Sequence, residues 1–287
     1  MKGINAIGEV LSRPVTWPDV ARFFVGRAVR GADVSAKKKE DKEEEITVSW
    51  YLRQDIVAII LILLTILIMP SALPFGVFQF WNSHGTSQDW LNSAYLIFIW
   101  GVGATLFFSY ATRNPHEQNM AAEKLMVVDA LVSLWAGVME EISFRWLLFL
   151  GAIITVQISN FFLGGFLGLF GMPGWGLVEL FQWYIVGTVA DFFTFGYLAE
   201  IFNNRSSWAI GAGLLAANAW FRDGHKYQGA LGILNSWFLG MFMFWFMFKF
   251  GLPATIAVHF AYDFLIGVVR YIDRSLERAQ YLRRRDK

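Results

Sequence analysis

Six long runs of apolar residues constrain the fold of this chain more than any other feature. Each run is largely uncharged, and most of them approach the roughly 20 residues that an α-helix needs to cross the hydrocarbon of a membrane. The alternation of polar and apolar residues that marks a membrane β-barrel is absent. The sequence therefore predicts a bundle of membrane-spanning helices. The runs are residues 56–69, 95–111, 146–170, 177–198, 229–248 and 252–269.

The composition agrees with a membrane protein. Of the 287 residues, 56% are hydrophobic and only 16% are charged, whereas about a quarter of the residues in a soluble domain are charged. The formal net charge of +1 gives no reason to expect nucleic acid as a partner. Because the chain has no cysteine, disulfides, thiol catalysis and cysteine metal ligands are excluded.

The chain divides into four predicted segments. Residues 1–50 are expected to be a cytoplasmic region with a charged linker at residues 37–45. They also hold a helix from Thr16 that either lies in the membrane interface or packs on its own domain. This region lacks the apolar segment of a cleavable signal peptide. Residues 51–120 are expected to form the first membrane helices, residues 121–272 an intramembrane core, and residues 273–287 a basic cytoplasmic tail.

The distribution of basic residues predicts the orientation in the cell membrane. Both ends of the chain are rich in arginine and lysine, which favours the cytoplasmic side for both and requires an even number of spans. The apolar run between Arg205 and Arg222 is too short to assign as a span, so six and eight spans both remain open. The predicted fold is thus an all-α, polytopic transmembrane helix bundle of six to eight spans.

The stretch GVMEEISFRW, residues 137–146, places three charged residues among apolar ones. A charged side chain in a membrane costs a few kcal/mol or more, so each one requires a reason. Glu141 and Arg145 are four residues apart, share a helix face and can pair. Glu140 lies about 100° from Glu141 and about 140° from Arg145 around the helix, so it faces a different environment. This geometry singles out Glu140 as a candidate general base.

Of the four histidines, His84 and His116 fall in polar loops and are expected at the surface, which leaves His225 and His259 as candidates. His225 follows Phe221 by four residues, and His259 precedes Asp263 by four. On a helix, His259 and Asp263 would share a face, so that the carboxylate could hold the orientation of the imidazole. For either histidine alone, a plain interhelical hydrogen bond is an equally good interpretation.

Taken in order, these motifs resemble the CAAX protease and bacteriocin-processing (CPBP, or Abi) family of glutamate intramembrane proteases. The similarity covers roughly residues 120–272, and the first 120 residues contribute nothing to it. It implies a metal-independent endopeptidase without a cofactor, whose catalytic cavity lies among the helices. The implied substrate is a membrane-associated protein or peptide. The motifs are Glu140-Glu141-x-x-x-Arg145, Phe221-x-x-x-His225 and His259-x-x-x-Asp263.

The resemblance also implies a role for each motif residue. Glu140 would activate the attacking water, and His225 would hold that water or carry its proton. Glu141 and Arg145 would support the first motif. His259 would help to stabilise the oxyanion of the tetrahedral intermediate.

Asp263 departs from the eukaryotic endopeptidase that trims prenylated CAAX proteins, which has asparagine at this point of the motif. Aspartate occurs among bacterial members of the family. An ionised carboxylate cannot donate a hydrogen bond to an oxyanion, so Asp263 is either protonated or orients His259 as its acceptor. We expect the orienting role.

The polar groups allow three other interpretations. A zinc site would have to gather its ligands from scattered helices without an H-E-x-x-H motif, so no metal is expected. A non-catalytic scaffold or regulator of the same fold is one alternative function. A proton-coupled transporter is another, with Asp129, Glu140, Asp191 and His259 as a relay, but it predicts inverted repeats that are not evident. We expect Asp129, Glu179 and Asp191 to accept interhelical hydrogen bonds or to reach the interface.

Overall fold

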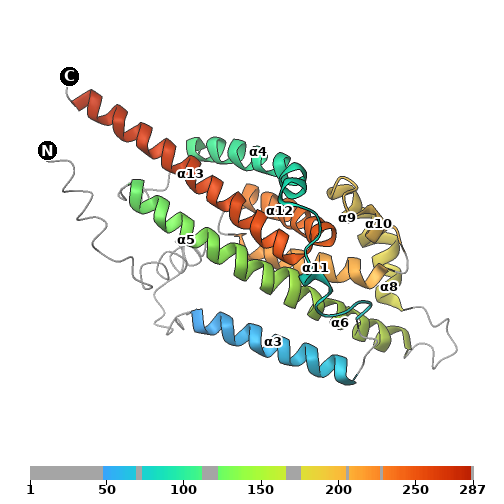
Figure 1. The fold of residues 1–287 in the computed structure, drawn as a ribbon. Coiled ribbons are helices and arrows are strands. Elements are labelled where there is room, and N and C mark those ends of the chain that lie inside the picture. Colours follow the sequence, from blue (N-terminus) through green and yellow to red (C-terminus); the bar gives the residue numbers. More distant parts are fainter. Residues whose placement is uncertain are drawn as a thin grey trace, which may run out of the picture. The chain divides into compact units, whose positions relative to one another are not determined.

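A computed structural model describes residues 48–68, 73–111, 122–165, 176–204, 207–226 and 229–285 (Figure 1). Within these ranges the secondary structure is helical and contains no β-strand, which confirms the predicted all-α class. The predicted interfacial helix and the charged linker lie outside the described residues. The same holds for His116, which belongs to the segment between residues 112 and 121.

Four helical segments in the described ranges are long and apolar enough to cross a membrane. They support the prediction of transmembrane helices, although the fourth predicted run does not form a span of full length. The first predicted run lies in α3 (Val48–Ile68), a helix of 21 residues, and Asp55–Ile68 is a shorter apolar segment of it that is not counted with the four. The fourth is helical only from Leu177 to Phe193 and then turns through Phe195, whose φ is 54°. The four segments are Ser87–Phe107, Asp129–Leu163, Gly229–Phe250 and Leu252–Leu276.

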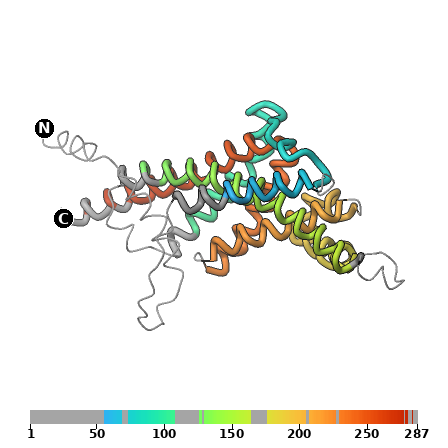
Figure 2. The backbone as a smooth tube through the Cα atoms, turned by 90° about the horizontal axis from the view of Figure 1, so that it is seen from below, coloured from blue at the N-terminus to red at the C-terminus, as the bar shows by residue number. Residues whose placement is uncertain are grey.

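The described chain forms two compact units, and the first contains residues 85–139 and 256–287. It includes α4 (Ser87–Ala111), nearly all of α5 (Ala122–Glu140) and most of α13 (Leu252–Arg285). Helices α5 and α13 run antiparallel and side by side (Figures 1 and 2). Their backbones approach closely, because a Cβ at Gly137 would lie 3.0 Å from the Cβ of Phe260. Small residues commonly allow such close packing between membrane helices.

Among the described residues, the second unit contains residues 48–84 and 140–255. Helix α11 lies at its centre, in contact with both α6 and α12. Gly213 of α11 allows the backbone of α6 to approach, with the amide nitrogen of Ile153 3.0 Å from the position a Cβ would take. The helices of this unit are α3 (Val48–Ile68), η2 (Gln79–Trp81), η4 (Glu141–Leu148), α6 (Phe149–Asn160), η5 (Phe161–Gly165), α8 (Leu177–Phe181), η6 (Gln182–Val186), α9 (Gly187–Phe193), α10 (Ala199–Phe202), α11 (Trp208–Gly224) and α12 (Gly229–Phe250).

A tight reversal at Gly251 separates α12 from α13. Its φ of 89° lies in the left-handed region that favours glycine. An added Cβ would also meet the backbone oxygen of Asn82, so this position has both a conformational and a steric requirement for glycine. Pro253 then falls in the first turn of α13, where a missing N–H costs no helical hydrogen bond.

The phenylalanine-rich run at residues 241–250 is mainly core rather than lipid-facing surface. Met243, Phe244 and Phe246 are each 0% exposed. Phe244 packs edge-to-face on Phe149 of α6 with ring centroids 5.4 Å apart. The composition of this run predicts a surface that faces lipid as well as one that packs, and for these three side chains the structure shows packing.

Candidate active site

The first motif contains a completely buried ion pair. Arg145 Nη1 lies 3.3 Å from Glu141 Oε1, and both side chains are 0% exposed. The four-residue spacing had predicted this pairing. Glu141 and Arg145 both belong to η4, a stretch of π-helix, and such stretches frequently occur at functional sites. Glu140 differs from its neighbour, because it is the last residue of α5 and is only half-buried.

Phe221 connects the first motif to the second. The guanidinium carbon of Arg145 lies 3.8 Å from the centroid of the Phe221 ring, which is a cation–π contact. The same ring lies 4.6 Å from the imidazole of His225, centroid to centroid. Arg145, Phe221 and His225 therefore form a continuous stack inside one compact unit. We call these three residues the Arg145 stack.

His225 closes the C-terminus of α11 with its side chain. Its backbone N–H donates to the carbonyl of Arg222, three residues earlier, at 3.0 Å, whereas in an α-helix it would donate to the carbonyl of Phe221, four residues earlier. The carbonyl of Phe221 instead lies 2.8 Å from Nδ1 of the imidazole. Because a carbonyl only accepts, Nδ1 must carry the proton in this contact, and in the neutral ring the lone pair is then on Nε2. The helix end thus selects the tautomer that can accept a proton at Nε2.

A small group of charges lies beside His225 at the protein surface. Asp223 accepts from Arg222 Nε at 2.7 Å, and its second oxygen lies 2.9 Å from the Lys226 ammonium. Lys226, and to a lesser extent Arg222, lowers the pKa of Asp223 below its ordinary value. Asp223 is therefore ionised at neutral pH and forms local charge pairs next to the second motif.

The third motif lies on α13 in the first unit. His259 Nε2 is 3.5 Å from Asp263 Oδ2, so the two residues share a face as their spacing predicted. The His259 side chain is 3% exposed, whereas that of Asp263 is 29% exposed. The separation is longer than an ordinary hydrogen bond of 2.7–3.2 Å. A small rotation of either side chain would bring the carboxylate within bonding distance of the imidazole.

Helix α3 contacts the first motif, and this contact was not predicted from the sequence. The Ser143 hydroxyl lies 3.1 Å from each carboxylate oxygen of Asp55, and it donates to that group. Ser143 stands between Glu141 and Arg145, so α3 is tied directly to the motif segment. An isolated acid at the start of an apolar run was the only available signal for Asp55. A contact across such a long sequence separation cannot be assigned from that signal.

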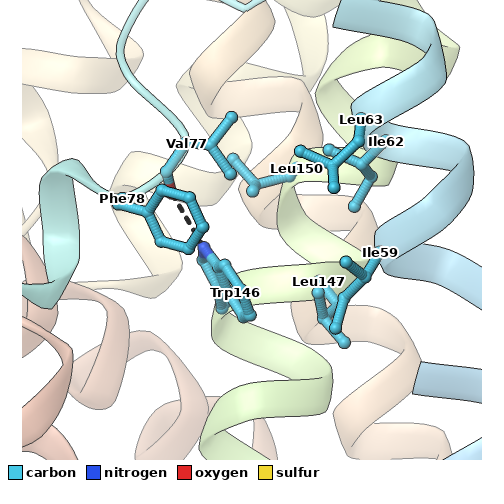
Figure 3. A pocket seen from close by; sticks show the side chains of 8 residues that line it. All are labelled: Ile59, Ile62, Leu63, Val77, Phe78, Trp146, Leu147 and Leu150. Carbon is cyan, nitrogen blue, oxygen red and sulfur yellow. Dashed lines mark hydrogen bonds between the residues drawn. The ribbon is translucent and has the colours of Figure 1, made fainter. Parts of the chain in front are cut away.

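Contacts of Trp146, the residue after Arg145, also hold the motif segment in place. Trp146 Nε1 donates to the carbonyl of Val77 at 2.8 Å (Figure 3). An apolar hollow of about 10 Å³ lies beside Trp146, close to the smallest volume that admits one water molecule. It is too small to be the predicted catalytic cavity, and none of the seven motif residues lines it. Its lining is Ile59, Ile62, Leu63, Val77, Phe78, Trp146, Leu147 and Leu150.

The other acids in the apolar runs make contacts outside the three motifs. Asp129 Oδ1 lies 3.4 Å from Arg270 Nη1 in the first unit, and Asp191 Oδ2 accepts a hydrogen bond from the Asn203 amide at 3.1 Å. For these two residues the predicted structural contacts are confirmed. Glu179 lies in the first turn of α8, where its backbone N–H donates to Asn160 Oδ1 at 3.2 Å. Within the described part of the chain, no three His, Asp or Glu side chains are grouped so that they could hold a metal ion.

No family model, curated protein or solved structure matches the chain. A functional proposal therefore depends on the geometry within each unit. In the second unit this geometry is the Arg145 stack with the buried Glu141 beside it. In the first unit it is the contact between His259 and Asp263.

Proposed function

We propose that this chain is an intramembrane endopeptidase of the CPBP type, which hydrolyses a peptide bond in a membrane-associated protein or peptide without a metal or cofactor. The observation that carries the proposal is the Arg145 stack, which joins two of the three motifs through direct ring contacts. A fully buried ion pair is a poor source of stability, because the desolvation of two charges offsets their attraction. Its presence beside Glu140 is therefore better explained by function than by stability.

The proposed reaction begins with water. Glu140 takes a proton from a water molecule whose oxygen attacks the carbonyl carbon of the scissile peptide bond. His225 holds that water or carries its proton. This requires a lone pair on Nε2, and the tautomer with the proton on Nδ1 provides it. As the carbonyl π bond breaks, negative charge develops on the oxygen, and His259 stabilises it. The C–N bond then breaks, and the leaving amine receives the transferred proton.

The remaining motif residues position these groups. Arg145 and Glu141 hold the first motif in place against Phe221. Asp263 acts as the acceptor that orients His259, which is consistent with their separation of 3.5 Å. Within the first unit, Gly137 allows α5 to approach α13 closely at Phe260. Gly137 precedes Glu140 by three residues, and Phe260 directly follows His259.

We further propose the membrane arrangement that the sequence predicted: six to eight spans, a catalytic cavity among them, and both termini on the cytoplasmic side of the cell membrane. The four candidate spans support a multi-pass arrangement. The shorter apolar helix Asp55–Ile68 and the helical run from Leu177 to Phe193 are the segments that would raise the number above four.

A single substitution tests the proposed chemistry. Glu140→Gln keeps the size of the side chain but removes the base, and it should lower kcat for cleavage of membrane peptides in liposomes by about 10²–10⁴-fold. Glu200→Gln is the matched control, because Glu200 is exposed on α10 and lies outside the motifs. A chelator should leave turnover unchanged. Full turnover by the Glu140→Gln protein would exclude Glu140 as the base. A native protein that binds membrane peptides without cleaving them would instead favour the scaffold.

A further inference from the structure

Asp129 and Arg270 form an ion pair that none of the three motifs includes, and their side chains are 6% and 15% exposed. The Oδ1 of Asp129 on α5 lies 3.4 Å from Nη1 of Arg270 on α13. Gly267 makes the approach possible, since a Cβ there would be 2.9 Å from the Cβ of Asp129. Both charges fall within the candidate membrane spans Asp129–Leu163 and Leu252–Leu276. A charge pair in such apolar surroundings is costly and is by default a functional group.

The pair lies on the same helix stripes as the proposed catalytic residues. On α5, Asp129 and Glu140 are eleven residues apart, which at 3.6 residues per turn leaves them only about 20° apart around the axis. On α13, His259 and Arg270 are also eleven residues apart and about 20° apart around the axis. Asp263 lies seven residues before Arg270 and belongs to the same stripe. The contact between Asp129 and Arg270 therefore joins the stripe of α5 that ends at Glu140 to the stripe of α13 that carries the third motif.

We infer that Asp129 and Arg270 are positioning residues, which fix the rotation of α5 and α13 about their axes and thereby aim Glu140 and His259. Apolar packing alone allows two helices to rotate or slip with little change in buried area, because one apolar side chain can replace another. An ion pair in apolar surroundings is satisfied in only one register, because any other register leaves a buried charge without its counter-charge. The catalytic part of this inference rests on the proposed function, whereas the register itself can be measured without any activity.

Crosslinking measures the register directly, because the natural chain has no cysteine. In a Gly137→Cys/Phe260→Cys background, the two Cβ atoms would be about as close as in a disulfide, after a shift of a few tenths of an ångström. Mild oxidation should crosslink this protein efficiently. Adding Arg270→Met should lower the crosslinking rate at least about fivefold, whereas Arg270→Lys, which keeps the charge, should largely preserve it. Lys226→Gln, which breaks an exposed ion pair with Asp223, is the matched control and should have no effect.

Kinetics then separate positioning from general damage. In the cysteine-free protein, Arg270→Met should lower kcat about 10- to 100-fold with KM nearly unchanged, as expected when catalytic groups are misaligned. If Arg270→Met alone fails to fold, Asp129→Asn/Arg270→Met leaves no buried charge and provides the same test. An unchanged crosslinking rate in the folded variant would overturn the inference. If the native protein shows no proteolysis at all, the proposed function fails, and the crosslinking rate alone supports or overturns the positioning role.

Discussion

Replacing Arg145 with methionine should destabilise the folded protein by about 3–5 kcal/mol. Methionine fills much of the space of the arginine stem but leaves the Glu141 carboxylate without its counter-charge at 0% exposure. Removing one member of a buried ion pair costs about this much, since the remaining charge stays desolvated. The loss of the cation–π contact with Phe221, 3.8 Å from the guanidinium, moves the expected value toward the upper end. The loss is a large fraction of the 5–15 kcal/mol by which native proteins are typically stable.

The double variant Glu141→Gln/Arg145→Met tests whether the buried charge is the cause. Glutamine has the shape of glutamate without its charge, so the double variant buries no ion. Its destabilisation should be smaller than the sum of the two single effects by at least about 2 kcal/mol. Thr65→Ala is a suitable control, because the Thr65 hydroxyl only donates to the Leu61 carbonyl of its own helix on an exposed face. That change should remain within about 0.5 kcal/mol of the native protein.

The free energies are measured by equilibrium unfolding of purified protein in mixed micelles, with the helical circular dichroism signal followed as the fraction of denaturing detergent rises. The native, single, double and control proteins are compared under identical conditions. An Arg145→Met protein within 1 kcal/mol of the native one would refute this reasoning. So would single effects that add without coupling in the double variant.

Two further predictions use the same unfolding measurement. Ser143→Ala should lower the free energy of unfolding by about 1–3 kcal/mol, since it removes a hydrogen bond to the partly buried Asp55 carboxylate. In a protein that already carries Asp55→Ala, the same substitution should leave the free energy of unfolding unchanged. Equal effects in both backgrounds would show that the two residues do not interact. Gly251→Ala should cost at least about 2 kcal/mol, because its φ of 89° and the nearby Asn82 oxygen both disfavour a side chain. A neutral Gly251→Ala substitution would mean that the reversal between α12 and α13 differs from the one described.

Local helix geometry explains which parts of the candidate site were predictable. Four residues along a helix bring side chains to the same face, so the pairing of Glu141 with Arg145 and the proximity of His259 to Asp263 could be predicted from spacing alone. The all-α class was equally accessible, because long apolar runs are a local property of the sequence. The π-helical stretch at Glu141–Leu148 was not predicted, since no residue in it marks a departure from the ordinary helical period.

The tertiary contacts could not be predicted because nothing local encodes them. Phe221 was singled out only as a motif position, and its contact with Arg145 depends on how α11 packs in its unit. The Asp55 carboxylate likewise meets Ser143 only after α3 docks on the motif segment. Hydrophobicity could not separate core from lipid-facing surface in the run at residues 241–250. In a membrane both environments are apolar, so phenylalanine suits either one.

The length of α13 has a mechanical consequence. Its 34 residues measure about 51 Å at 1.5 Å per residue, whereas the hydrocarbon of a bilayer is about 30 Å thick. The helix is uninterrupted from the buried imidazole of His259 to the exposed side chain of Arg278. Because the helix is continuous, a rotation of its arginine-rich end about the helix axis would also rotate the imidazole of His259.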